Sequence, residues 1–263
     1  MRIAVISPHA ANNGNTTLAM LIAMELASAG KLTCLAHVRP VSNCFYRYLN
    51  FKGFEDKTST PSQIVKILRD GSLTGNDARA YCKDVGGDLE AFTNRDSNFT
   101  DDDMNFMLRY IAKSFPHENV VFDVDDDDLE KCKAVIKLCD VVILNLTQSI
   151  KELEHFKDRR DEYMAVLEGK PLIKVINRYM SDAGTIKEVE KWMGLSKSKG
   201  WLVLHYNPFI TWATNHGKLN ILFRNINSKD PRVIELRSDL TKICTTIMQA
   251  KSTNDKKKGG GHK

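Results

Sequence analysis

A short apolar run, a polar loop and a helical run open the chain, and this order constrains the fold more than any other feature. Residues 2–6 are apolar apart from Arg2, residues 7–17 are mostly small or polar, and residues 18–27 have a strongly helical composition. A strand, such a loop and a helix in succession are typical of a phosphate-binding loop, whose amides and helix N-terminus attract an anion. We therefore expect an anion pocket near the start of the chain.

The loop departs from the common phosphate-binding pattern G-x-x-x-x-G-K-[ST]. Gly14 and Thr16 fit the pattern, but His9 stands where the first glycine belongs and Asn15 where the lysine belongs. The lysine of this pattern reaches the β- and γ-phosphates of a nucleotide. Whether the loop still works on a nucleotide is therefore the main question that the sequence poses.

Composition narrows the class of protein. Of the 263 residues, 42% are hydrophobic and 27% are charged, and the mean hydropathy is −0.33. No apolar run approaches the ~20 residues that span a bilayer, and the chain begins with a strand pattern, so we expect neither a transmembrane segment nor a signal peptide. The six cysteines form no C-x-x-C pair and the seven histidines are scattered. These patterns predict reduced thiols in a cytoplasmic protein and suggest no zinc site.

Apolar runs of strand length alternate with helical segments along the whole chain. Strands are expected at residues 2–6, 32–38, 89–93, 119–124, 140–146, 172–177 and 201–206, and helices at 16–29, 62–69, 101–114, 129–138, 150–168, 185–193, 207–215 and from 231 onward. This alternation predicts a three-layer, doubly wound α/β fold with a mostly parallel sheet of six to eight strands and helices on both faces. No linker interrupts residues 1–250, so we expect one domain, with a loop-rich excursion at 71–87.

Residues 40–60 are rich in aromatic side chains. Phe45, Tyr46, Tyr48, Phe51 and Phe54 lie close together in this segment. One interpretation is a short helix that packs at the edge of the sheet, and the other is an exposed surface for a partner. We favour the packed helix.

The end of the chain combines an amphipathic helix with a basic tail. Between residues 231 and 250, one apolar stripe recurs at spacings of three and four, formed by Val233, Leu236, Leu240, Ile243 and Ile247. Packing on the domain is the interpretation we favour over a membrane or coiled-coil contact. Residues 251–263 lack hydrophobic side chains and carry +4 of the net charge of +5. We expect a disordered tail that either aids solubility or contacts anionic lipid or DNA.

Four landmarks, in the right order, resemble the ParA/MinD group of deviant P-loop ATPases over roughly residues 1–220. Residues 10–17 align without gaps with the family's loop K-G-G-V-G-K-T-T. The later landmarks are the strand that ends in Asp123, the run Val175-Ile176-Asn177-Arg178-Tyr179, and Leu204-His205-Tyr206-Asn207-Pro208 with Gly217-Lys218 after it. The loop alone is a weak signal, whereas four ordered landmarks favour this fold strongly.

The resemblance implies ATP and Mg²⁺ as ligands and assigns roles to individual residues. The loop residues Asn12, Asn13, Gly14, Asn15, Thr16 and Thr17 would surround the phosphates. Thr16 would also ligate Mg²⁺, and Asp123 would hold the ion through water. Asn177 would read the base, with Arg178 and Pro208 beside the nucleotide. The alternative for Asp123 is a strand-end charge that faces solvent.

Three charged residues of the family pattern are replaced in this sequence. Asn15 replaces the lysine that meets the β- and γ-phosphates, and Ala10 replaces a second lysine that reaches across an ATP-bound dimer. His37-Val38-Arg39 stands in place of Asp-x-Asp, where one aspartate orients the attacking water. Loss of one preorganised donor commonly costs about 10²–10³ in rate. We therefore expect slow or absent hydrolysis and assign no catalytic residue.

Two functions from different classes remain open at this point. The first is a degenerate ParA/MinD-like binding, scaffolding or positioning factor, with weak or lost nucleotide binding and with itself or a related ATPase as dimer partner. The second is an active ATP-dependent dimerisation switch for DNA partitioning or for positioning a cell-envelope or transfer complex. Either protein would be cytoplasmic, and peripheral to the membrane or nucleoid if its tail binds there.

Overall fold

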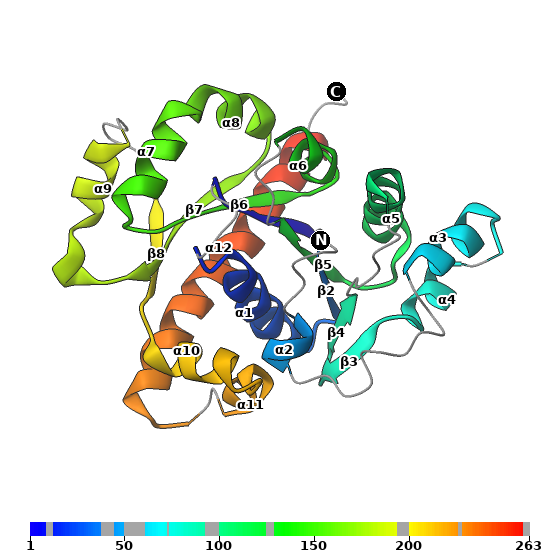
Figure 1. Ribbon diagram of the computed structural model, residues 1–263, viewed down its shortest axis with the longest axis horizontal. Coiled ribbons are helices and arrows are strands. Elements are labelled where there is room, and N and C mark those ends of the chain that lie inside the picture. Colours follow the sequence, from blue (N-terminus) through cyan, green and yellow to red (C-terminus); the bar gives the residue numbers. More distant parts are fainter. Residues whose placement is uncertain are drawn as a thin grey trace.

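The protein is built on one eight-stranded sheet, which the computed structural model places at the centre of the fold (Figure 1). The structure describes residues 1–8, 13–37, 45–49, 61–72, 74–92, 100–124, 129–193, 200–225 and 228–259. The strands are β1 (Arg2–Ile6), β2 (Thr33–His37), β3 (Lys83–Gly86), β4 (Leu89–Phe92), β5 (Asn119–Val124), β6 (Val141–Leu146), β7 (Leu172–Tyr179) and β8 (Trp201–His205). Their order is β3-β4-β2-β5-β1-β6-β7-β8, and β3 is antiparallel to β4 whereas the other neighbouring pairs are parallel.

Helices cover both faces of the sheet. They are α1 (Asn15–Ser28), α2 (Phe45–Leu49), α3 (Pro61–Arg69), α4 (Gly75–Arg79), α5 (Asp101–Ser114), α6 (Leu129–Ile136), α7 (Ile150–Asp158), α8 (Arg160–Leu167), α9 (Ile186–Trp192), α10 (Pro208–Asn215), α11 (Leu219–Arg224) and α12 (Pro231–Gly259), with the 3-10 helix η1 (Ser181–Ala183). One buried cluster joins α1 and α12 to the sheet, and a second joins α5, α7 and α8 to its other face. The predicted three-layer, doubly wound fold with a mostly parallel sheet is thus confirmed.

Local sequence signals account for most element boundaries. Helix α5 begins after Thr100, whose side chain accepts a hydrogen bond from the Asp103 amide while Asp103 caps Thr100 in return. This capping box satisfies amides that the first helical turn leaves unpaired. The central strands β5 and β6 are buried along their whole length, as expected of a parallel sheet covered on both faces.

Three segments differ from the sequence-based expectation. The single helix expected over 150–168 is two helices, α7 and α8, with a break at Arg159 (φ −109°, ψ 14°) that no glycine or proline announces. The excursion at 71–87 contains α4 and the edge strand β3, whose polar sequence has no strand periodicity. Helix α11 was also not expected.

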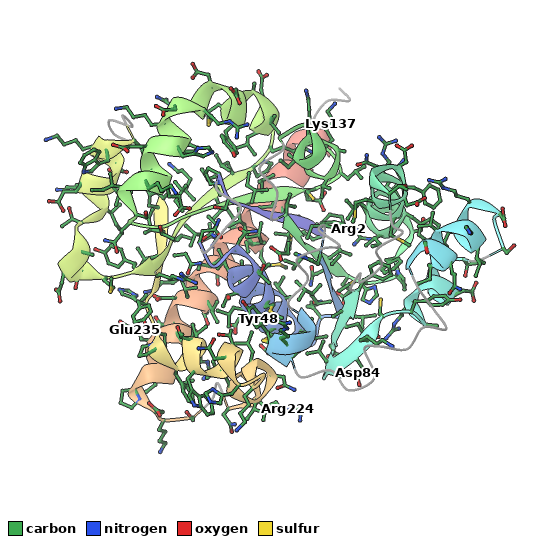
Figure 2. The ribbon with its side chains drawn as sticks, in the orientation of Figure 1. Arg2, Tyr48, Asp84, Lys137, Arg224 and Glu235 are labelled. Atoms are coloured by element: carbon green, nitrogen blue, oxygen red, sulfur yellow. The ribbon has the colours of Figure 1, made fainter. Side chains whose placement is uncertain are left out.

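The aromatic segment contains the short helix α2. Its Leu49 is buried and its Tyr48, labelled in Figure 2, packs against the same core cluster as α1. Helix α2 contacts α10 and α11. The packed helix is therefore confirmed for residues 45–49, whereas Phe51 and Phe54 lie outside the described residues.

The terminal helix packs on the domain as its apolar stripe predicts. All five stripe residues are buried, and α12 contacts α1 and β8. The helix continues to Gly259, although disorder was expected from Lys251 onward. Lysine is a good helix former, and adding a residue to an existing helix costs little once the first turn has formed. Among the described residues, none of the helices combines the length and apolar character needed to cross a membrane.

The sheet topology determines where the candidate site lies. Strand β1 is central and pairs in parallel with β5 on one side and β6 on the other. The carboxyl ends of these three strands therefore meet at one edge, where open α/β sheets bind their ligands. The loop after β1 and Asp123 near the end of β5 both lie at this edge.

Candidate functional site

The described part of the loop turns sharply into helix α1 at Gly14. Gly14 has φ 73° and precedes the first helical residue, and its carbonyl accepts the first helical hydrogen bond from Leu18 at 2.9 Å. The side-chain oxygen of Asn13 accepts a hydrogen bond from the Asn15 amide at 2.8 Å. The Asn15 amide, which we expected to contact phosphate, is therefore hydrogen-bonded within the loop itself. Asn12, His9 and Ala10 lie outside the described residues.

Asn15 points into the sheet rather than out of the loop. Its Nδ2 donates to Oδ1 of Asp123 at 2.9 Å and to the Val5 carbonyl at 3.0 Å, and the residue is 2% exposed. The residue aligned with the phosphate-binding lysine therefore ties helix α1 to strands β1 and β5.

Asp123 is held from its other side by His37. His37 and Asp123 are register partners in the parallel strands β2 and β5, so their side chains share one face of the sheet. His37 Nδ1 donates to Oδ2 of Asp123 at 2.8 Å, and both side chains are 0% exposed. Each carboxylate oxygen thus accepts a hydrogen bond inside the protein, which contradicts the alternative of a solvent-facing strand-end charge.

A second group of hydrogen bonds connects the loop to helices α7 and α8. Asn13 Nδ2 donates to the Ser7 hydroxyl at 2.6 Å, and that hydroxyl donates to the buried Glu152 at 3.2 Å. Glu152 also accepts from the Thr147 amide at 3.1 Å, and the Tyr163 hydroxyl donates to the Pro8 carbonyl at 3.2 Å. Hydrogen bonds to residues far along the chain therefore hold the loop in place.

The end of β7 lies directly against the loop. Asn177 Nδ2 donates to the carbonyls of Asn13 and Gly14, each at 3.2 Å. A Cβ added at Gly14 would lie 2.8 Å from that nitrogen and 3.2 Å from Arg178 Nε. Arg178 itself has φ 54°, a left-handed conformation that is uncommon for a side chain of its size. A side chain at position 14 would therefore require the Asn177 side chain to shift.

A cavity of about 150 Å³ opens beside this contact. It is lined by Gly14 and Thr17 on one side, by Asn177 and Arg178 on another, and by the start of α10 with its cap Asn207. The volume is small compared with the ~300 Å³ or more that is typical of pockets for drug-sized ligands. It is polar and lies where the resemblance expects a nucleotide base.

The predicted site residues thus separate into groups. Asn13, Gly14, Thr17, Asn177 and Arg178 converge on the loop and the cavity, and residues on both sides of Pro208 line the cavity. Asn15 and Asp123 meet beneath the loop. Thr16 is half-buried in the first turn of α1.

Several members of this network were not identified from the sequence. Ser7, Asn145 and Glu152 are buried polar residues around the loop, and Asn145 Nδ2 approaches the Asn13 carbonyl and Asn15 Oδ1 at 3.4 Å. Ser7 pairs with Glu152, and Asn145 with Asn13 and Asn15, across 130 or more residues of the chain, so no local pattern could join these pairs. A polar residue inside an otherwise apolar strand, such as Asn145, was the one available signal.

Comparisons with known proteins bear on the fold. No protein-family model matches the sequence, and no curated protein matches it. Among solved structures, it is similar to the septum site-determining protein MinD of Pyrococcus horikoshii in complex with Mg-ADP, with a TM-score of 0.67, 12% identity, and 94% and 95% of the two chains covered.

Two further structures extend the likeness to ParA-type proteins. A ParA family ATPase from Chlorobium tepidum gives a TM-score of 0.67 at 12% identity, covering 93% of this chain and 98% of the other. A putative plasmid partition protein from Borrelia burgdorferi, bound to AMPPNP, gives 0.64 at 15% identity, with 92% and 97% covered. At such identities the likeness concerns the fold, and this chain has the fold of the MinD and ParA ATPases.

Proposed function

We propose that this protein is a MinD/ParA-like scaffolding or positioning factor that acts by binding partners, with hydrolysis of ATP slow or absent and nucleotide binding weak or lost. The observation that carries the proposal is the buried chain His37–Asp123–Asn15. It uses, for internal hydrogen bonds, the two positions that the resemblance assigns to magnesium and to the phosphate-binding lysine.

The chemistry of phosphoryl transfer also supports this proposal. Catalysis of that reaction depends mostly on positioning and on stabilising negative charge. Asn15 is neutral and its amide is committed to Asp123 and Val5. The remaining substitutions, at Ala10 and Arg39, fall outside the described residues. A loop that offers only amides and a helix N-terminus retains attraction for an anion but lacks the cations that lower the barrier.

The donor set also fits magnesium poorly. Mg²⁺ is usually bound through one or two carboxylates and keeps several of its water molecules. Asp123 is fully buried with a hydrogen bond on each oxygen, so a water molecule that bridges it to an ion would have to enter the core. The hydroxyl of Thr16 is the other ligand that the resemblance assigns, and one hydroxyl is a weak basis for an ion site. We therefore derive no catalytic step through Mg²⁺.

A second candidate function, the ATP-dependent dimerisation switch, is favoured by one observation. The cavity beside Gly14 brings Asn177, Arg178 and Asn207 together where a base would lie. If this cavity accepts adenine, the loop amides would face the phosphates. The partner would then be a second copy or a related ATPase, with DNA or anionic lipid contacted by the basic tail.

The two candidates are separated by thermal unfolding and native mass measured with ATP or ADP, each with and without Mg²⁺. A nucleotide at 100 times its dissociation constant would stabilise the folded state by about 2.7 kcal/mol, which is roughly 5–10 °C for a chain of this length. We expect no shift of that size, no nucleotide-dependent dimer and no phosphate release. A shift and phosphate release that Thr16→Ala abolishes would overturn the proposal in favour of the switch.

A further inference from the structure

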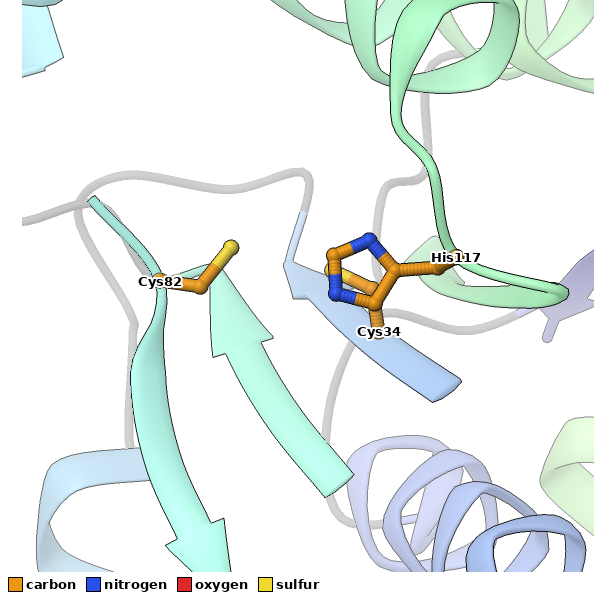
Figure 3. Close-up of side chains that lie close together, drawn as sticks. All are labelled: Cys34, Cys82 and His117. Carbon is orange, nitrogen blue, oxygen red and sulfur yellow. The ribbon is translucent and has the colours of Figure 1, made fainter. Parts of the chain in front are cut away.

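Two cysteines and one histidine gather at the edge of the sheet opposite the loop (Figure 3). Cys34 lies in the first half of β2, Cys82 immediately precedes β3, and His117 precedes β5. Their potential ligand atoms, two sulfurs and a ring nitrogen, all lie within 4.8 Å of one another. Figure 3 shows the Cys82 sulfur directed toward the His117 ring. The three residues are far apart in sequence and are brought together by the pairing of β4, β2 and β5.

The hydrogen bonding of His117 gives independent support for a ligand at this cluster. Its Nε2 forms a hydrogen bond of 2.8 Å with Oε2 of Glu90, whereas its Nδ1 is buried and has no hydrogen-bond partner among the described residues. The residue as a whole is 2% exposed. Because a carboxylate only accepts hydrogen bonds, the proton lies on Nε2 and the lone pair on Nδ1. A buried polar atom without a partner is rare and calls for an explanation.

Glu90 is itself held in place. Arg79 Nε donates to its two oxygens at 2.8 and 3.0 Å. A carboxylate that accepts from one nitrogen of an imidazole, while the other nitrogen keeps its lone pair, is the arrangement that orients histidine ligands in metal sites. Burial lowers the pKa of His117, although its contact with Glu90 acts in the opposite direction. With its proton on Nε2, the neutral imidazole presents the Nδ1 lone pair, which is the form that binds a metal.

We propose that Cys34, Cys82 and His117 Nδ1 form a binding site for one Zn²⁺ ion. Thiolate and imidazole together are the donor set that zinc prefers. Zinc bonds of about 2.3 Å to sulfur and about 2.0 Å to nitrogen place tetrahedral ligands about 3.5 Å apart, so the three atoms need to approach one another by roughly 1 Å. Side-chain rotation of the half-buried Cys82 can supply much of this movement.

The burial of the three residues indicates the side from which an ion would enter. Cys34 and His117 are buried and Cys82 is half-buried, so ion entry and a water ligand in the fourth position come from the side of Cys82. A disulfide between the two cysteines is the competing use of the same sulfurs, but it leaves His117 Nδ1 without a partner. The site shares no residue with the loop network, so it stands whether or not the protein binds a nucleotide.

The test is a zinc titration of the full, reduced, metal-free chain in competition with a chromophoric chelator. We expect one ion per chain. Cys82→Ser is expected to weaken binding by about 100-fold or more, and Glu90→Gln, which alters a positioning residue, by about 10–100-fold. Cys244→Ser is the matched control, because it removes another buried thiol, located on α12, and should leave zinc affinity unchanged.

A second measurement separates ligation from fold effects. Co²⁺ in place of Zn²⁺ should give a sulfur-to-cobalt charge-transfer band that is weakened in Cys82→Ser and retained in Cys244→Ser, while circular dichroism confirms that each variant is folded. Equal zinc affinity in the wild type and in Cys82→Ser would overturn the proposal. So would a metal-free protein that forms a Cys34–Cys82 disulfide in air and takes up no zinc when reduced.

Discussion

Two buried polar clusters lie at opposite ends of the same pair of strands, β2 and β5, and they differ in the hydrogen bonding of the atoms that could bind an ion. At the carboxyl ends, Asp123 accepts from His37 and from Asn15, and each of its oxygens has a donor. At the amino ends, His117 has one bound nitrogen and, among the described residues, one without a partner, beside the thiols of Cys34 and Cys82. We call the first cluster closed, because both oxygens of its carboxylate have donors, and the second open, because His117 Nδ1 has none.

The difference shows that location in the fold does not by itself define a site. A buried carboxylate whose two oxygens are already hydrogen-bonded inside the protein is held rigidly and has less to offer a ligand. A buried atom with no partner retains a cost that a bound ion can remove. Four predictions test this contrast.

The first prediction concerns the closed cluster. Replacement of Asp123 by alanine leaves the buried His37 and Asn15 without their shared acceptor. We expect the free energy of unfolding to fall by about 3–5 kcal/mol, measured by urea denaturation with an unchanged slope. The control Asp182→Ala removes an exposed carboxylate and should change stability by less than about 0.5 kcal/mol. An unchanged stability of Asp123→Ala would mean that the network is not structural.

The second prediction compares how much Zn²⁺ and how much Mg²⁺ with ATP stabilise the folded protein. With free Zn²⁺ at 100 times its dissociation constant, the wild type should gain about 2.7 kcal/mol, a rise in melting temperature of roughly 5–10 °C. Removal of zinc with a chelator should reverse the gain, and Cys82→Ser should not show it. Mg²⁺ with ATP should produce no comparable shift. The contrast fails if Mg²⁺ with ATP stabilises the protein and Zn²⁺ does not.

The third prediction concerns the contact between the loop and β7. Gly14 and Gly30 have nearly the same φ, 73° and 72°, but a Cβ at position 14 would lie 2.8 Å from Asn177 Nδ2, whereas one at position 30 would meet nothing within 4 Å. Gly30→Ala should cost about 1 kcal/mol for its backbone conformation, and Gly14→Ala about 1–2 kcal/mol more. Thermal or urea unfolding of the pair measures the difference. Equal losses would show that the Asn177 side chain can move aside without cost.

The smallest expected effect is that of Thr16→Ala. If Thr16 is no magnesium ligand, its replacement should change unfolding free energy by less than about 1 kcal/mol. The thermal response to Mg²⁺ with ATP should also stay the same as in the wild type. A Thr16→Ser variant, which keeps the hydroxyl, is the matched control. A response present in wild type and Thr16→Ser but absent in Thr16→Ala would point to a nucleotide site at the closed cluster.

Several elements followed directly from local sequence. The helix over 101–114, its cap at Thr100 and the strand over 119–124 have the predicted boundaries. Apolar periodicity, capping residues and uninterrupted strand runs act within a few residues, so a linear pattern contains them. The break at Arg159, the polar edge strand β3 and the helical continuation beyond Lys251 have no such local marker.

Local sequence patterns were enough to predict the strand–loop–helix start, the alternation that makes a doubly wound sheet, and the loss of charge at Asn15. What replaced that charge is visible only in the fold, because the pairing of His37 with Asp123 depends on the register of two strands 86 residues apart. The same holds for Cys34, Cys82 and His117, which no spacing in the sequence joins. Local patterns encode elements, whereas side-chain clusters arise where the sheet brings distant strands side by side.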